Sequence, residues 1–124
     1  MTAIIWYVQL VHYPTFEFVA VENFEAFHKQ HSRRTTSLVL VPMLLEITSA
    51  LGLVWFAFST SSLFLVGLSL LTWALTFFVS VPLHTRLSRG HDPYVLDKLV
   101  STNWLRTLTW TLKLVWCGGA LMTH

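Results

Sequence analysis

Long apolar segments separated by short polar ones constrain this chain more than any other feature. A helix that crosses the hydrocarbon core of a bilayer needs about 20 mostly apolar residues. Four segments approach or exceed this length, at residues 3–20, 37–58, 63–83 and 99–122. A soluble fold of 124 residues has too little interior to bury so much apolar surface. The sequence therefore predicts an integral membrane protein.

The amino-acid composition supports the same prediction and excludes another class of function. The chain is 54% hydrophobic and 11% charged, whereas soluble domains have about 25% charged residues. The net charge of +2 does not indicate nucleic-acid binding, because the basic residues are few and flank the apolar segments. A single cysteine, Cys117, excludes an intramolecular disulfide.

The positions of the basic residues predict the topology. Six of the eight lie between the first and second or between the third and fourth segments: Lys29, Arg33, Arg34, Arg86, Arg89 and Lys98. The positive-inside rule makes that side cytoplasmic, so both termini are expected on the opposite side. The chain is thus predicted to be one all-α domain over residues 1–124, an antiparallel bundle of four transmembrane helices.

The first apolar segment is the shortest, and a second kind of helix is expected after it. Pro14 removes a backbone donor and should kink the segment or end its regular part. In residues 22–32, Phe24 and Phe27 stand at helical spacing among polar residues. This pattern predicts a short helix that lies in the membrane interface, between the first and second spans.

Polar residues inside the spans are the main candidates for function, because ionisable groups in lipid are costly. At about 1.5 Å of rise per residue, His12, Glu46, Asn103 and Arg106 are expected to share one layer in the cytoplasmic half. Arg106 keeps its proton and needs an acceptor, so Glu46 is its predicted partner. The pair is interpreted either as catalytic or as a structural ion pair that fixes the register of the bundle.

Histidines form the second part of this predicted cluster. His84 is expected at its rim, and His28 and His31, three residues apart on one helical face, should close it from below. With His12 they are candidate ligands for a transition metal or a haem, or proton carriers. The alternative is a set of histidines that only form hydrogen bonds across helices. Asn103, Arg106 and Tyr13 are the candidate residues for binding a small anionic or carbonyl group.

Several short motifs give the chain a family resemblance. They are His12 to Phe16, Phe24 to Arg33, Pro42 to Glu46, Val81 to His84 and Thr102 to Thr107. Together they resemble a family of small four-helix bacterial integral membrane proteins of uncharacterised activity, which implies a multi-pass protein of the bacterial inner membrane. The four-span build and the Asn103-to-Thr107 element are more distantly similar to anthrone-oxygenase-like membrane proteins. That likeness implies oxygen-dependent oxidation of a hydrophobic substrate, and it assigns no residue a role.

Two functional hypotheses follow. In the first, the His/Glu/Arg cluster binds a metal, a haem or a small polar or anionic ligand, and the chain is a binding protein or a redox enzyme for a hydrophobic substrate. In the second, the chain is a non-enzymatic accessory subunit, and it packs against other copies of itself or against partner subunits of a membrane complex. A cavity beside Arg106 would favour the first hypothesis over the second.

Overall fold

The computed structural model describes the backbone of residues 1–122 and the side chains of residues 1–119. Within this part of the chain every regular element is helical. The first helical run consists of α1 (Thr2–Tyr7), the π-helix η1 (Val8–His12) and the 3₁₀-helix η2 (Tyr13–Phe18). The change to 3₁₀ geometry coincides with Pro14, as the sequence predicted, because proline cannot donate the backbone bond of a regular helix.

The longest helix is α2, which spans Val21–Phe56 without a break. The segment 22–32 is helical as predicted, but it is not a separate interfacial helix, because it forms the first turns of α2. At about 1.5 Å per residue, the 36 residues of α2 are about 54 Å long, which exceeds a hydrocarbon core of about 30 Å. The first third of α2 nevertheless packs within the bundle, because Phe24, His28 and His31 are buried there.

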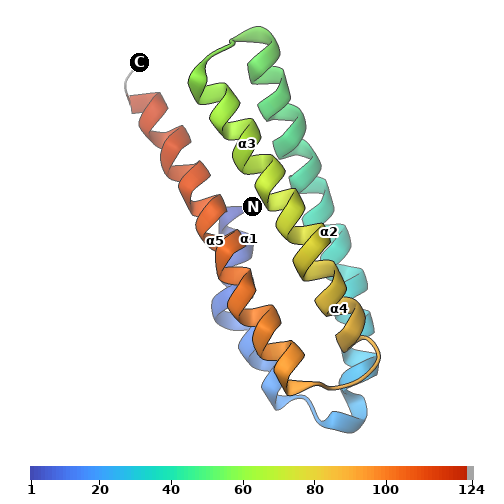
Figure 1. The fold of residues 1–124 in the computed structure, drawn as a ribbon. Helices are drawn as coiled ribbons and strands as arrows, with labels where there is room; N and C mark the ends of the chain where they lie inside the picture. The colour runs from blue at the N-terminus through green and yellow to red at the C-terminus, as the bar shows by residue number, and fades with distance from the viewer. Residues whose placement is uncertain (123–124) are drawn as a thin grey trace.

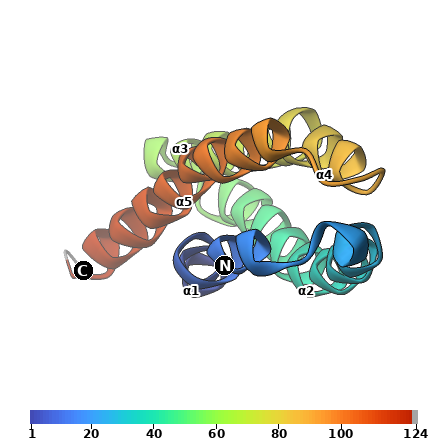
Figure 2. The same ribbon diagram turned by 90° about the horizontal axis from the view of Figure 1, so that it is seen from below.

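A short turn leads from α2 into α3 (Thr60–Leu75), which continues through the π-helix η3 (Thr76–Ser80) into α4 (Val81–Leu87). The last helix, α5, spans Pro93–Met122. Figure 1 shows that successive helical runs alternate in direction and that the first run reaches only about half the height of the bundle. Seen from below in Figure 2, α3, α4 and the start of α5 form one layer, and α1 with the start of α2 forms the other. Both long helices slant between the layers, so that α2 approaches α3 and α5 approaches the level of α1.

Two apolar clusters hold the layers together. Near the loops, Phe16, Phe24, Leu87 and Leu99 are fully buried among neighbouring aliphatic residues. Towards the middle of the bundle, a second cluster consists of Ile5, Met43 and Trp110. These clusters fix the first helical run against α2 and α5, and the polar residues of interest lie between them and around them.

The start of α3 offers a first test of the local structure. Ser59 Oγ accepts a hydrogen bond from Ser62 N at 3.1 Å, and Ser62 Oγ accepts one from Ser59 N at 3.0 Å, which completes a capping box. Ser59→Ala is expected to lower the free energy of unfolding by about 1 kcal/mol. The matched control is Ser61→Ala, since Ser61 is exposed. Thermal unfolding in mild detergent measures both variants, and an equal effect of the two would contradict the capping role.

Candidate functional site

The four histidines proposed from the sequence come together from three helical elements. His12 Nε2 lies 2.7 Å from His31 Nδ1, and His28 Nε2 lies 3.1 Å from His84 Nδ1. The two pairs are adjacent, since the ring centroids of His31 and His84 are 5.8 Å apart. Residues 72 positions apart in the chain thus form one group, which we call the histidine cluster (His12, His28, His31 and His84).

Hydroxyl groups surround the histidine cluster. Thr35 Oγ1 lies 3.1 Å from His31 Nδ1, and the Tyr13 hydroxyl lies 3.5 Å from His84 Nε2. Ser88 Oγ lies 3.4 Å from His28 Nδ1. In contrast, the buried Nε2 atom of His31 has no hydrogen-bond partner. The hydrogen-bonding capacity of this nitrogen is therefore unused in the structure.

The arrangement of the histidines is that of hydrogen-bonded pairs. A tetrahedral metal at about 2.0–2.1 Å from each nitrogen would hold two ligand atoms about 3.3 Å apart, whereas His12 and His31 approach to 2.7 Å. Among the residues that the structure describes, no group of three His, Cys, Asp or Glu side chains could hold a metal ion. The metal and haem predictions for these histidines thus have no support in the geometry.

Arg106 is the most unusual polar residue of the bundle. It is 6% exposed, and its Nη1 donates to Ser80 Oγ at 3.1 Å and to Asn103 Oδ1 at 3.2 Å. The guanidinium also lies 5.2 Å from the centre of the Trp110 ring. Its Nε–H is buried and has no hydrogen-bond partner among the side chains and backbone that the structure describes. In the described part of the chain no carboxylate pairs with Arg106, so the charge is only partly compensated.

The predicted pairing of Glu46 with Arg106 is wrong. Glu46 Oε2 instead accepts a hydrogen bond from Trp110 Nε1 at 2.7 Å and pairs with Lys113 Nζ at 2.8 Å. Lys113 is buried and donates further to Ser69 Oγ at 3.0 Å. Glu46 and Lys113 thus form their own ion pair, about two helical turns from Arg106 along α5.

A network of side-chain amides, which the sequence analysis did not predict, holds Asn103 in contact with Arg106. Asn103 Nδ2 donates to Gln9 Oε1 at 2.7 Å, and Gln9 Nε2 donates to the backbone oxygen of Val100 at 3.3 Å. Gln9 and Asn103 are both buried. Gln9 was overlooked because it carries no charge, although a lone amide in an apolar segment is itself a signal of a polar contact between helices.

Both π-helical segments adjoin these polar groups. The segment Val8–His12 carries Gln9 and His12, and Thr76–Ser80 carries Ser80. A π-turn inserts one extra residue per turn, which rotates the following side chains relative to a regular helix, and such turns are frequent at functional sites. Both segments therefore direct polar side chains into the bundle. A regular α-helix would place these side chains in other directions.

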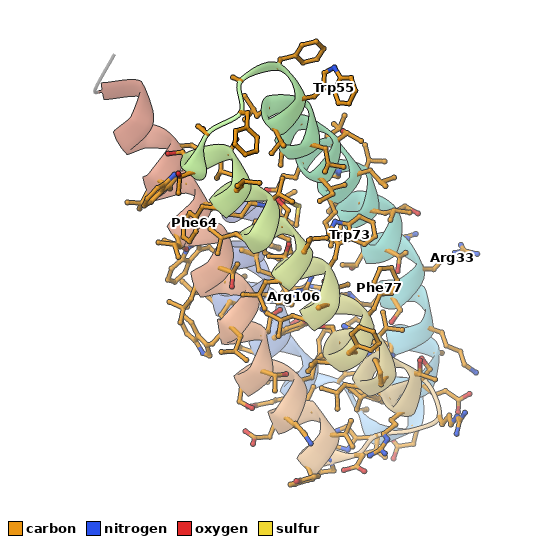
Figure 3. All side chains as sticks on the ribbon, turned by 45° about the horizontal axis from the view of Figure 1, so that its top comes forward. Arg33, Trp55, Phe64, Trp73, Phe77 and Arg106 are labelled. Atoms are coloured by element: carbon orange, nitrogen blue, oxygen red, sulfur yellow. The ribbon has the colours of Figure 1, made fainter. Side chains whose placement is uncertain are left out.

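A cavity of about 310 Å³ opens beside Arg106 and the histidine cluster. Its polar lining contains Tyr13, His31, His84, Arg106 and the hydroxyl residues Ser32, Thr35, Thr36, Thr76, Ser80, Thr85 and Ser88. Most of its surface is apolar, and residues such as Ile4, Ile5, Val8, Val39, Leu40, Met43, Trp73 and Phe77 contribute to it. In Figure 3 the side chains of Arg106 and Trp73 lie within the bundle, while Arg33 and Trp55 extend away from it. The cavity therefore combines a polar lining with a hydrophobic body.

The candidate residues thus separate into two groups. His31, His84, Tyr13 and Arg106 line the cavity, and Asn103 accepts a hydrogen bond from Arg106. His12 and His28 do not line it, and each contacts one of the two lining histidines. Glu46 lies instead at a second cavity of about 470 Å³ together with Lys113 and Trp110. Comparisons with protein families, with curated proteins and with solved structures find no match for this chain.

Proposed function

We propose that this chain is a four-span membrane protein that binds a small amphiphilic molecule in the cavity beside Arg106, with an anionic or carbonyl group of the ligand at the guanidinium. The observation that carries the proposal is that Arg106, 6% exposed and without a carboxylate partner in the described part of the chain, lies in the wall of this cavity. An arginine cannot neutralise itself by losing its proton. Its energetic cost in an apolar bundle is offset when an acceptor from a ligand completes its hydrogen bonds.

The distribution of side chains supports the membrane setting. Two helical runs, Val21–Phe56 and Thr60–Leu87, are long and apolar enough to cross a bilayer. On α5, Leu108 and Val115 are 57% and 66% exposed, whereas Arg106 and Lys113 are buried. Apolar residues outside and charged residues inside are the pattern expected for a lipid-facing helix. We therefore propose α5 and the first helical run as the other two spans, with both termini on the non-cytoplasmic side of a bacterial inner membrane.

The chemistry of the cavity sets the kind of ligand. Its apolar walls favour a hydrophobic body, and its polar lining offers an arginine, two histidines, a tyrosine and several serine and threonine hydroxyl groups. Ligand sites typically pair an apolar lining with a few convergent polar groups of this kind. A cavity beside Arg106 favours this ligand-binding hypothesis over a purely structural accessory subunit. Redox catalysis on the bound molecule stays a prediction.

Binding measurements with three matched probes test the proposal. Wild-type protein in lipid nanodiscs is titrated with decanoate, decan-1-ol and decylamine by calorimetry. Decanoate is expected to bind most tightly, and Arg106→Gln should weaken its binding by about 30-fold or more, because a buried charged hydrogen bond is lost. Lys98→Gln is the control, since it removes an exposed positive charge from the same helix. Equal binding of decanoate to wild type and Arg106→Gln would refute the proposal.

A further inference from the structure

We infer that the site beside Arg106 takes up a proton when its anionic ligand binds, and that the hydrogen-bonded pair of His12 and His31 receives this proton. The inference rests on the proposed function, because it describes how the same ligand site is regulated. The proton comes from water and forms an N–H bond on an imidazole. The empty site, one ligand anion and one proton from water thus give the protonated, ligand-bound site.

The charges around the cavity couple the proton to the ligand. Arg106 lines the cavity, and among the described residues no carboxylate pairs with it. A second positive charge in this apolar interior is costly while the site is empty. A bound anion compensates Arg106, and a proton on a nearby imidazole then restores the net charge that the empty site had. The anion and the proton should therefore each favour the binding of the other.

The pair of His12 and His31 has the geometry to hold this proton. His12 Nε2 lies 2.7 Å from His31 Nδ1, so that one of these nitrogens donates to the other. His31 is 7% exposed and lines the cavity, whereas His12 is only partly buried and does not line it. An imidazole can accept a proton at one ring nitrogen and release one from the other. A proton that reaches His12 from outside can therefore move to His31, beside the cavity.

The second pair of the histidine cluster is less suited to receive the proton. His28 Nε2 lies 3.1 Å from His84 Nδ1, which is longer than the contact between His12 and His31, and hydrogen bonds with a charged partner are short. His28 is also fully buried. A proton can therefore reach this pair only through other side chains, whereas the first pair has a partly exposed member.

No carboxylate contacts the histidine cluster in the described part of the chain. The groups that can ionise there come from the first helical run, α2, α4 and α5, and they are His12, Tyr13, His28, His31, His84 and Arg106. Lys29 and Glu25 of α2 pair with each other at the surface. Because no acidic side chain can compensate a proton on the pair, the charge of the bound ligand has to do so.

The test measures how the binding of decanesulfonate, whose charge does not change with pH, depends on pH in phosphatidylcholine nanodiscs. Between about pH 8 and about pH 6, where histidines change charge, its affinity for wild type should rise by about tenfold, because a proton binds together with the anion. Calorimetry at about pH 7 in two buffers with different ionisation enthalpies should show the uptake of up to about one proton per bound ligand.

Variants of the pair show where the proton binds. In His31→Gln the affinity for decanesulfonate should change by less than about twofold over the same pH range, because the receiving imidazole is lost. If His31→Gln does not fold, His12→Gln replaces it, with the same expected loss of pH dependence. His91→Gln is the matched control, since the ring of His91 contacts Phe24 and belongs to neither pair. This variant should keep the pH dependence of wild type.

The outcomes separate this inference from the proposed function. If decanesulfonate binds in an Arg106-dependent manner with equal affinity at both pH values and without proton uptake, the inference is overturned while the proposed function stands. If the pH dependence remains in His31→Gln and His12→Gln, the proton binds elsewhere and the inference is again overturned. Binding of decanoate but not decanesulfonate would also overturn it, because the proton would then arrive on the ligand. If neither probe binds in an Arg106-dependent manner, the proposed function fails and the inference fails with it.

Discussion

Replacing Glu46 with leucine is expected to lower the free energy of unfolding by about 2–4 kcal/mol, the largest loss of stability among the single substitutions considered for this chain. Glu46 Oε2 is the acceptor for both Lys113 Nζ and Trp110 Nε1. Without it, Lys113 keeps its charge in a buried position with only Ser69 as a partner. The side chain of Glu46 is 28% exposed, so water reduces the penalty below that of a fully buried pair.

The reciprocal and combined variants show whether the loss comes from the unpaired charge. Lys113→Met alone should also destabilise the protein, whereas Glu46→Leu combined with Lys113→Met should recover to within about 1 kcal/mol of wild type. Unfolding by sodium dodecyl sulfate in mixed micelles measures all three variants. Glu25→Gln is the control, because Glu25 forms an exposed ion pair with Lys29, and it should change stability by less than about 1 kcal/mol. A double variant as unstable as the worse single one would contradict a role for the pair.

Replacing Arg106 with methionine is expected to act in two opposite directions. Without ligand, the variant should be more stable than wild type by about 1–3 kcal/mol, because a buried charge without a carboxylate partner is removed. Its affinity for decanoate should fall by about 30-fold or more. Ser80 and Asn103 lose one hydrogen bond each, which offsets part of the gain, although the Asn103 amide keeps its bond to Gln9.

Thermal unfolding with and without decanoate measures both effects of this substitution. Wild type should gain stability as decanoate is added, because the ligand binds the folded state, while Arg106→Met should not respond. Lys113→Met provides the contrast, since Lys113 has a carboxylate partner and its removal should destabilise. If Arg106→Met is instead less stable than wild type and still responds to decanoate, the arginine is structural and the proposed function is wrong.

The local sequence patterns predicted most helix boundaries, because these depend on nearby residues. Pro14 marks the point where the first helical run becomes 3₁₀, and the predicted segment 63–83 lies within the run of α3, η3 and α4. The segment 22–32 was correctly expected to be helical. The sequence analysis did not predict that this segment continues into α2. Its polar character suggested a separate element, although none of its residues ends a helix.

The candidate site was predicted in part. The histidines were expected to gather, and His12, His28, His31 and His84 do so. The partner of Glu46 was predicted wrongly. The depth of each residue in the bundle was counted from the end of its own helix, and these ends do not lie in one plane. Glu46 is about 38 Å along α2 from Val21, whereas Arg106 is about 20 Å along α5 from Pro93, at about 1.5 Å per residue. Lys113 is closer to the level of Glu46, and the two residues pair.

The sequence by itself determined that this chain is helical, that two long runs can cross a bilayer and that ionisable residues lie within apolar segments. Those features follow from composition and from periodicity along one chain. Only the tertiary structure decided which polar groups meet. The half-length first helical run, the long unbroken α2 and the two π-segments set the relative height and rotation of the helices. Among the described residues, these shifts leave Arg106 without a carboxylate partner at the edge of a cavity. A displacement of one turn changes every partner across a helix interface.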